Sequence, residues 1–497
     1  MSTAASPQAT PYRRVAVNYA LLVTGEFFAK ILTFFVYTHL ARTLGQQRYG
    51  SLEFVLAVMV FFALPVDFGL GAYGAREIAK NPLRASQLFR EITGMRLILS
   101  FCSLGVLAVF TLVIDRSLEE KVLLGLYGVS LLAMPALVYW FFQAHDLTHW
   151  VGIASLIRQA VFAAFLIVFF HQSTPLYYIG VAECGSVAAA GLFGFYVMRN
   201  RMGYALEWPS LEGKKLFEHW RQSMPIGWTE LAWAAIWYFS TVLLGLYADH
   251  SLGWFGASHR VLMALHTFVW LYFFNLLPSI SRCANGPPEN LLRLTGGSIR
   301  LVAWAGVFGA FLLTALGEQI FTLAYGRQFA GAALFFSVMV WMLPLSLLSG
   351  HHRYILIGYN LQNYLLRATV VSGVLAVVLN LVLIPRYGAM GAAWSLLIAN
   401  SANFALAYYY VRTLVVPVPF AAFLARPLAA TAVAGLVFLR CSRWNIWAAA
   451  AAATAVYLLL LISVEGKQVR GAVRRLLQQK TTAAMDPIQT EIRPSRL

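Results

Sequence analysis

Long apolar runs recur along the whole chain and are separated by short polar connectors. A run of about 20 apolar residues is long enough to cross the hydrocarbon core of a bilayer as a helix. Lipid cannot satisfy free backbone groups, so the crossing segments must be helical. The pattern predicts about fourteen transmembrane helices, at residues 17–41, 51–73, 93–114, 121–143, 150–171, 176–198, 223–247, 252–277, 297–316, 329–350, 364–385, 389–411, 424–440 and 446–464. The expected fold class is therefore an all-α polytopic membrane protein.

Composition supports this interpretation. Hydrophobic residues make up 60% of the 497 residues and charged residues only 11%, whereas soluble proteins are about 45–50% apolar and about 25% charged. The 37 basic residues outnumber the 20 acidic ones, which would suit a nucleic-acid-binding protein if they formed a patch. They lie instead in the connectors, where they act as topology signals. We expect no nucleic-acid partner.

The basic residues also predict an orientation. If the N-terminus is cytoplasmic, about 26 Lys and Arg residues fall in inner connectors and the tail, about eight fall in outer connectors, and three lie within spans. The inner connectors then include Arg96, Arg353 and the pair His351-His352. Both termini are predicted to be cytoplasmic, which requires an even number of helices.

Two halves of the chain share short patterns in the same order. Thr24-Gly25-Glu26-Phe27 and Arg48-Tyr49-Gly50-Ser51 in the first half correspond to Trp228-Thr229-Glu230-Leu231 and Trp254-Phe255-Gly256-Ala257 in the second. Transporters are often built from such repeats. The sequence predicts a cytoplasmic N-terminus (1–16), an N-lobe of helices 1–6 (17–200), a cytoplasmic linker (201–222), a C-lobe of helices 7–12 (223–412), two further helices (413–465) and a basic cytoplasmic tail (466–497).

Seven of the charged residues inside the predicted spans are candidates for a functional site. A charge near the bilayer centre costs several kcal/mol, so it usually faces a partner or a water-filled cavity. We interpret Lys30, Arg158 and Arg260 as substrate-binding cations of a central cavity, and Glu26, Asp67, Glu183 and Glu230 as candidates for coupling to an ion.

Each charge also has a purely structural interpretation. The alternatives are an i,i+4 pair for Glu26 and Lys30, snorkelling to an interface for Arg158 and Arg260, fixation of the loop at Gly69 and Gly71 for Asp67, and helix–helix bonds for Glu183 and Glu230. The pattern predicts no catalytic residue, cofactor or metal site, and Cys102, Cys184, Cys283 and Cys441 are far apart.

Several motifs carry a family resemblance. They are Tyr49-Gly50-Ser51-Leu52-Glu53-Phe54, Asp67-Phe68-Gly69-Leu70-Gly71, Arg76-Glu77-Ile78-Ala79-Lys80, Phe255-Gly256-Ala257-Ser258-His259-Arg260 and Ile384-Pro385-Arg386-Tyr387-Gly388. The chain resembles, over roughly 15–415, the Wzx-type polysaccharide and O-antigen flippases of the MATE-like MOP exporter superfamily.

The resemblance implies two six-helix lobes around a cavity that opens alternately to each side of a bacterial inner membrane. The implied cargo is an oligosaccharide on undecaprenyl pyrophosphate, moved from the cytoplasmic to the periplasmic leaflet for surface polysaccharide synthesis. Other candidate partners are membrane lipids, H⁺ or Na⁺, and the polysaccharide polymerase and chain-length proteins. The resemblance singles out Arg260, Lys30 and Glu26 as candidate substrate contacts.

Three rival functions stay open at this stage. A multidrug antiporter of the same fold would need an acidic, aromatic cavity for cationic drugs, whereas three intramembrane cations are predicted here. A lipid II-type flippase shares the fold and the head-group chemistry. A membrane enzyme, such as a polymerase or acyltransferase, would need an acid/base pair or a sizeable outer loop, and the longest connector has only about 20 residues.

Overall fold

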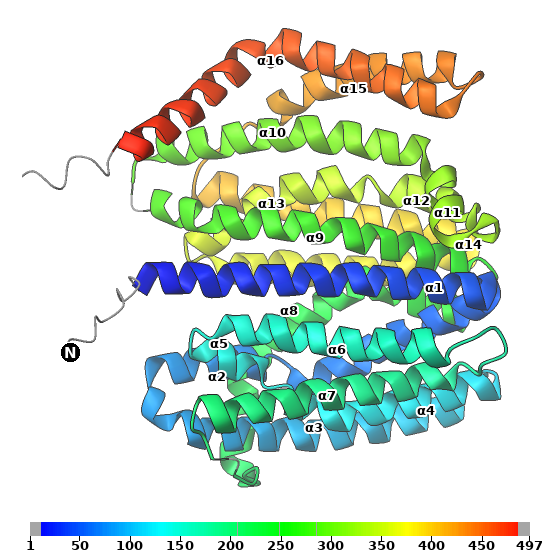
Figure 1. The fold of residues 1–497 in the computed structure, drawn as a ribbon, viewed down its shortest axis with the longest axis vertical. Helices are drawn as coiled ribbons and strands as arrows, with labels where there is room; N and C mark the ends of the chain where they lie inside the picture. Colours follow the sequence, from blue (N-terminus) through cyan, green and yellow to red (C-terminus); the bar gives the residue numbers. More distant parts are fainter. Residues whose placement is uncertain (1–10, 206, 248, 285, 486–497) are drawn as a thin grey trace, which may run out of the picture.

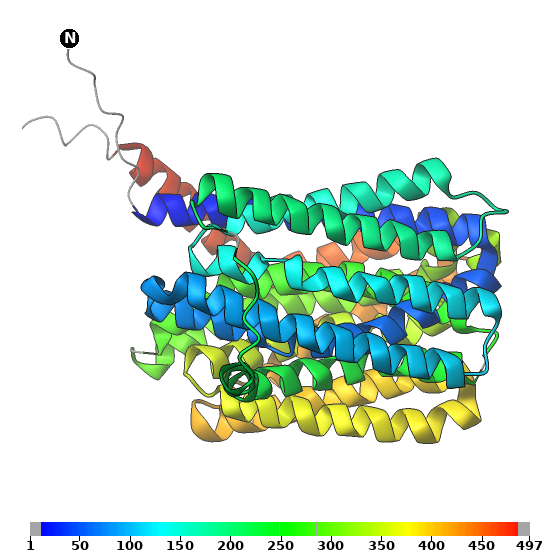
Figure 2. The ribbon, with the colours of Figure 1, turned by 90° about the horizontal axis from the view of Figure 1, so that it is seen from below.

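The computed structural model describes residues 11–205, 207–247, 249–284 and 286–485. Within these ranges every regular element is helical, and the helices lie side by side along one direction (Figures 1 and 2). The α-helices are α1 (Pro11–Asp67), α2 (Leu70–Lys80), α3 (Ala85–Val113), α4 (Leu118–Ala133), α5 (Tyr139–Ala144), α6 (Thr148–Phe169), α7 (Tyr177–Arg201), α8 (Gly213–Leu246), α9 (Leu252–Cys283), α10 (Pro288–Ala315), α11 (Gly317–Tyr325), α12 (Ala332–Met339), α13 (Met342–Gly358), α14 (Gln362–Leu414), α15 (Phe420–Cys441) and α16 (Ile446–Met485). Short 3-10 turns occupy Pro82–Arg84, Met134–Ala136 and Arg327–Phe329.

Twelve helical segments of the described chain are long and apolar enough to cross a membrane. Two of them, Leu21–Lys80 and Gln362–Leu414, contain 60 and 53 residues, far more than the roughly 20 that one crossing needs. Each bends back at a glycine with a left-handed backbone, Gly45 (φ 74°) and Gly388 (φ 53°). Dividing both segments there would give fourteen passes, which remains a prediction. The expected class, an all-helical multi-pass membrane protein, is confirmed.

The helices form two groups, a lower group of α1 to α7 and an upper group of α8 to α16, which meet where α1 packs against α8 and α9. In Figure 1, α2 to α7 lie below α1, whereas α9 to α13, α15 and α16 lie above it. Helix α1 contacts α3 and α6 of the lower group and α9 of the upper group, and α8 packs along α14. The start of α1 and the last turns of α16 lie at the same end of the bundle (Figure 1). We call this the inner end, and the end with Gly45 and Gly388 the outer end.

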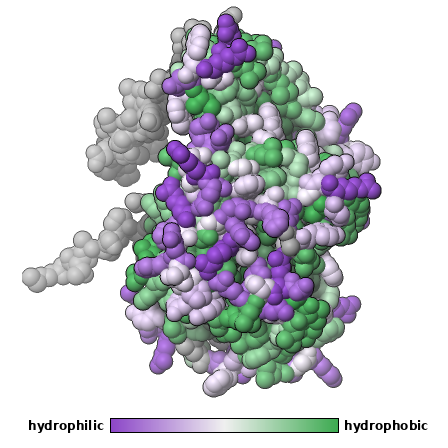
Figure 3. Space-filling model, turned by 90° about the vertical axis from the view of Figure 1, so that its right-hand side faces the viewer, coloured by the Kyte–Doolittle hydropathy of each residue, from purple (hydrophilic) through white to green (hydrophobic). Residues whose placement is uncertain are grey.

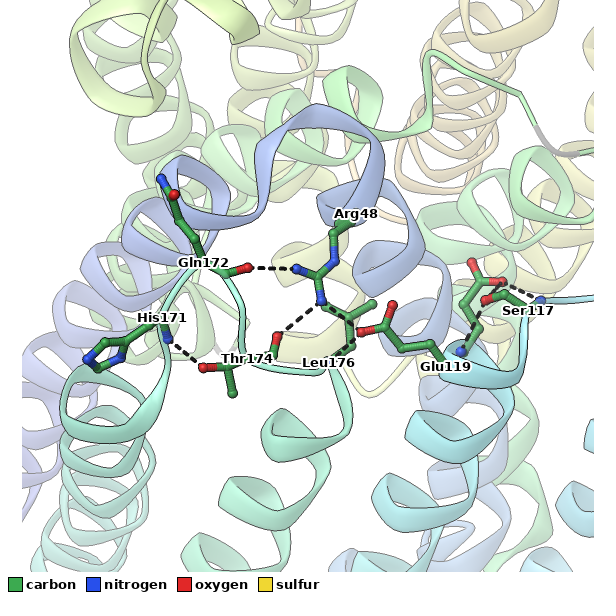
Figure 4. A network of polar contacts seen from close by, with 8 residues as sticks. Arg48, Ser117, Glu119, His171, Gln172, Thr174 and Leu176 are labelled. Carbon is green, nitrogen blue, oxygen red and sulfur yellow. Dashed lines mark hydrogen bonds and ion pairs between the residues drawn. The ribbon is translucent and has the colours of Figure 1, made fainter.

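At the outer end, Arg48 ties three connections of the lower group together. Its guanidinium pairs with the carboxylate of Glu119 at 2.7 Å and donates to the carbonyl oxygens of Gln172 and Thr174, both at 3.1 Å (Figure 4). The same carboxylate accepts the backbone N–H of Leu176 at 2.8 Å. The bend of α1, the start of α4 and the α6–α7 connection are thereby joined. Figure 3 views this end and shows hydrophilic residues gathered over its middle.

Two predicted spans end earlier than expected. The span predicted at 51–73 stops at Asp67, because Phe68 (φ 38°) and Gly69 (φ 81°) turn the chain before α2 begins. The span predicted at 121–143 is interrupted at Met134–Ala136, where Pro135 has no N–H to continue α4.

The assignment of Arg96 and of residues 351–353 to inner connectors is wrong. Arg96 lies inside α3, where it is buried and paired with Asp67 at 3.1 Å. Residues 351–353 lie inside α13, and both histidine side chains are fully buried. The His351 ring and the Ser298 hydroxyl form a hydrogen bond of 2.6 Å. Counting basic residues could not find these positions, because the partners come from other helices.

Candidate functional site

A polar cavity of about 220 Å³ lies between the two helix groups. Its lining comes from α1, α4, α8 and α9, and consists of Tyr37, Glu53, Leu56, Ala57, Val60, Tyr127, Tyr238, Thr241, His259, Arg260 and Met263. Ionisable side chains among helices that cross a bilayer are energetically costly, and they usually mark a functional site. We therefore treat this cavity as the candidate substrate site.

An ion pair between the two groups dominates this cavity. The Nε and Nη2 atoms of Arg260 on α9 donate to the two carboxylate oxygens of Glu53 on α1, at 2.7 and 2.9 Å. The guanidinium carbon lies 3.5 Å from the centre of the Tyr37 ring, so a cation–π contact adds to the pair. Only 5% of the Glu53 surface is exposed. A buried ion pair is favourable only when its hydrogen-bond geometry is good, and removing one partner leaves an uncompensated buried charge.

A glycine of the family motif lets the two charged helices approach. A Cβ atom at Gly256 would lie 2.4 Å from Cγ of Glu53, well inside contact distance. Gly256 lies one turn before Arg260 on α9. Without a side chain there, the Glu53 side chain can lie along α9 and reach the guanidinium.

The cavity is sealed from the outer end by close backbone contacts between the two groups. A Cβ atom at Gly253 would lie 2.0 Å from the backbone carbonyl oxygen of Gln46, and the side-chain amide of Gln46 donates to the backbone carbonyl oxygen of His250. Nearby, Nε of Arg42 donates to the carbonyl oxygen of Ala324 at 2.7 Å. These contacts join the α1 bend to the α8–α9 turn and to α11.

Toward the inner end, Lys30 lies on the face of α1 that carries the cavity residue Tyr37, but it is not among the residues that line the cavity. Leu21, Phe28 and Phe35 recur every seven residues on α1 with exposed apolar side chains, which marks the lipid-facing stripe. Lys30 follows Leu21 by nine residues, about two and a half turns, and therefore lies on the opposite face. It precedes the cavity residue Tyr37 by about two turns on that face, yet its side chain is exposed. An exposed side chain on this face borders accessible space, which we call the vestibule.

A second cation, Arg353, lies toward the inner part of α13. Its side chain is exposed, unlike the adjacent buried histidines. It lies within electrostatic range of His266 on α9, the helix that also carries Arg260. Sequence reasoning placed Arg353 in a loop and so missed it as a candidate for the vestibule.

The remaining predicted charges lie outside the described cavity lining. Arg158 pairs with Glu183 within the lower group, and Glu183 is buried. Asp67 pairs with Arg96 and accepts the backbone N–H of Gly71 at 3.4 Å, as its loop-fixing interpretation requires. Glu230 is half-buried on α8 within electrostatic range of Asp67. The snorkelling interpretation of Arg158 and Arg260 does not fit these pairs.

The most important residue that sequence reasoning missed is Glu53. It appears in the family motif, but no role was predicted for it from the sequence. A carboxylate about 10 Å into an apolar helix that begins near residue 46 was the available signal. Its partner Arg260 is 207 positions away, so their pairing could not be read from the sequence.

Within the described residues, Glu26 and Lys30 form no ion pair with each other. If they act independently, Glu26→Ala and Lys30→Ala should each lower export, and the double variant should be at least as defective as the worse single one. A mutually neutralising pair would instead make the double variant milder than either single variant. Surface polysaccharide, normalised to the amount of membrane-inserted protein, distinguishes the two results.

Comparisons with known proteins identify the fold. The chain is similar to the lipid II flippase MurJ in an inward closed conformation (TM-score 0.73, 14% identity, 90% of this chain and 100% of that one). It is also similar to an inward-facing multidrug resistance MATE family transporter of the MOP superfamily (TM-score 0.62, 12% identity, 80% and 95%). The chain thus shares its fold with these two transporters, as the sequence motifs predicted.

The sequence itself defines the family. The family model described as "Polysaccharide biosynthesis protein" matches residues 15–284, more than half of the chain. A protein described as "Putative O-antigen transporter" from Escherichia coli (strain K12) is 21% identical over 413 residues, which are 80% of this chain and 96% of that protein. The chain belongs to the polysaccharide biosynthesis protein family.

Proposed function

We propose that this protein is a flippase that moves an oligosaccharide linked to undecaprenyl pyrophosphate from the cytoplasmic to the periplasmic leaflet. Family membership and the O-antigen transporter relative support the cargo class. The observation that carries the mechanism is the Arg260–Glu53 pair, which joins the two helix groups inside a polar, membrane-embedded cavity.

The pair offers a site that a pyrophosphate can take over. The guanidinium fork of an arginine binds phosphate oxygens in the same bidentate way as a carboxylate. A pyrophosphate that enters the cavity can replace Glu53 on Arg260, which weakens the link between the two groups. Exchange of one anion for another keeps the arginine charge compensated, while the released Glu53 carboxylate must be hydrated or protonated to avoid the large cost of an unpaired buried charge.

We propose the following order for the remaining steps. Lys30 and Arg353 attract the anionic head group into the vestibule from the inner end, which we place in the cytoplasm. Replacement of Glu53 then permits the contacts at Gly253 and Arg42 to separate, so that the cavity opens outward. When Glu53 returns to Arg260, it displaces the head group and restores the outward seal. This is an alternating-access cycle driven by differential binding to two states.

Two rival functions fit the cavity less well. A cationic drug needs a free carboxylate, whereas Glu53 is the one carboxylate among the described lining residues and is already paired. An enzyme that transfers sugars or acyl groups needs a positioned acid/base group. The buried His259 beside Arg260 contacts the rings of Tyr238 and Trp237, which is a packing environment.

Coupling to H⁺ or Na⁺ is part of the proposal. Glu183 and Asp67 are held by Arg158 and Arg96, so a cation would have to displace an arginine. Within the described residues, Glu26 and Glu230 have no ion-pair partner. These two are therefore the carboxylates that we propose for ion binding.

Deletion of the encoding gene tests the proposed function. The deletion strain should accumulate lipid-linked oligosaccharide on the cytoplasmic leaflet, lose surface polysaccharide and keep an intact cell wall. Mass spectrometry of extracted lipids measures the accumulation, and a plasmid copy should reverse it. Accumulation of lipid II with lysis would instead support the lipid II-type alternative, and normal lipid pools would contradict both.

A further inference from the structure

A second, entirely apolar hollow lies between the two helix groups. Its volume is about 640 Å³, within the range of roughly 300–1,000 Å³ that ligand pockets occupy. All lining side chains are apolar, and they come from α1, α3, α8 and α14: Val58, Phe61, Phe62, Phe110, Trp228, Leu231, Ala232, Ala235, Phe239, Val242, Val370, Gly373, Val374, Val377 and Val378. We call this hollow the lateral groove.

The lateral groove and the polar cavity lie back to back. Ala57 lines the cavity and Val58 the groove; Tyr238 and Phe239, and Thr241 and Val242, divide in the same way. The second part of α1 and the outer part of α8 therefore form a wall that separates the groove from the cavity. This wall is the seam along which the two groups must part.

The groove is open to lipid on its α14 side. The side chains of Val374 and Val378 are 60% and 50% exposed, and these residues lie within a membrane-spanning segment. At the inner end, Trp228 contacts the ring of Phe68 with the ring centres 5.6 Å apart. Hydrocarbon chains of the bilayer thus have direct access to the hollow.

The length of the groove indicates which hydrocarbon it fits. On α8 the lining runs from Trp228 to Val242, fourteen residues or about 21 Å along the helix. One leaflet of a hydrocarbon core about 30 Å thick is only about 15 Å deep. A phospholipid chain that belongs to one leaflet would leave part of such a groove empty. A long polyisoprenoid chain can follow it from one leaflet into the other.

We propose that the lateral groove holds the polyisoprenoid chain of the lipid-linked substrate while its head group occupies the polar cavity. This rests on the proposed function. The seam between α1 and α8 then opens to pass the link between head and chain, and the chain stays in contact with the protein throughout the crossing. Because lipid is as apolar as the groove, the chain gains van der Waals packing and a defined path along the protein, and no hydrophobic free energy.

Photo-crosslinking tests this placement directly. A benzophenone amino acid is introduced at Val374 in the groove, at Val433 as a lipid-exposed control on α15, and at Met263 in the polar cavity. Each full-length variant is placed in phosphatidylethanolamine–phosphatidylglycerol nanodiscs with tritiated undecaprenyl pyrophosphate. We expect labelling at position 374 to exceed that at 433 about tenfold, and unlabelled undecaprenyl pyrophosphate, but not extra phospholipid, to suppress it.

The other outcomes are distinguishable. Equal labelling at 374 and 433, or competition by phospholipid, would overturn the groove proposal. Labelling at 263 alone would overturn it while leaving the proposed function standing. Labelling at neither 263 nor 374 would count against both.

A matched pair of substitutions gives an independent readout. Val374→Trp fills the groove from its exposed side and should lower export about tenfold with unchanged protein amount, since the side chain lies outside the packed core. Val433→Trp is the same substitution at an exposed position of α15 and should leave export unchanged. Equal export from both variants would contradict a role for the groove.

Discussion

Arg260→Ala is expected to abolish export of surface polysaccharide. The substitution removes the group that binds the pyrophosphate and leaves Glu53 buried without a counterion, which costs about 3–5 kcal/mol. Both the specific activity and the amount of folded protein should therefore fall. Immunoblots of membranes and staining of surface polysaccharide measure the two effects separately.

A double variant separates stability from transport. In Glu53→Ala/Arg260→Ala both buried charges are gone, so the protein amount should recover toward that of the wild type while export stays absent. Arg260→Lys keeps the charge but loses the bidentate geometry, and should export weakly. Normal surface polysaccharide in Arg260→Ala, or in the double variant, would show that this cation does not act on the substrate.

Gly227→Val is expected to hold the inner end of the protein open. A Cβ atom at Gly227 would lie 2.4–2.7 Å from three ring atoms of Phe68. Phe68 cannot easily retreat, because its backbone has a left-handed conformation and the adjacent Gly69 packs against Ile226. The added side chain should push α8 away from the lower group, at an overpacking cost of about 1–3 kcal/mol, and export should fall at least tenfold.

The conformational effect can be measured as a distance. Spin labels at Leu83 and Gln362, both exposed and at the inner end of different helix groups, should move apart in Gly227→Val after the four native cysteines are replaced. Gly105→Val is the control, because a Cβ atom at Gly105 would have no neighbour within 4 Å. An unchanged distance distribution in Gly227→Val would mean that this contact does not control the inner end.

Hydropathy predicted the class of fold well, because the bilayer imposes one rule on every span. Helices must satisfy their own backbone groups over a fixed thickness, so α6, α7 and α15 lie close to the predicted ranges. Local exceptions arise where chemistry other than hydropathy decides. Pro135 interrupts one predicted span, and the left-handed Phe68-Gly69 turn ends another.

The site was predicted only in part, because its key interactions join distant positions. Arg260 was recognised from its depth in an apolar helix, but the sequence could not show that Glu53 faces it across the two groups. Arg96 was assigned to a connector because the positive-inside rule counts charges without their partners. Asp67, which pairs with it, permits the arginine to lie inside α3. Pairing of this kind is a property of the tertiary structure.

The inner-end contacts also depend on residues that the sequence did not single out. His219 on α8 bridges Tyr73 and Glu91 of the lower group, with contacts of 3.1 and 2.8 Å. All three side chains are buried, and their positions along the chain follow no repeat. Helix α8 begins at the inner end and continues along the cavity. The His219 bridge, the Gly227 contact and the cavity residue Tyr238 therefore lie on one helix.

Reconstitution of the purified protein is the most direct test of translocation with anion exchange at Arg260. Liposomes would contain undecaprenyl pyrophosphate bearing a disaccharide with a fluorescent label, and an impermeant quencher would report the outer-leaflet fraction over time. If anion exchange at Arg260 drives translocation, wild-type protein makes the inner-leaflet probe accessible to the quencher, whereas Glu53→Ala/Arg260→Ala protein leaves it as protected as in empty liposomes. Equal exposure of the probe by the wild-type and double-variant proteins, or no exposure by either, would contradict it.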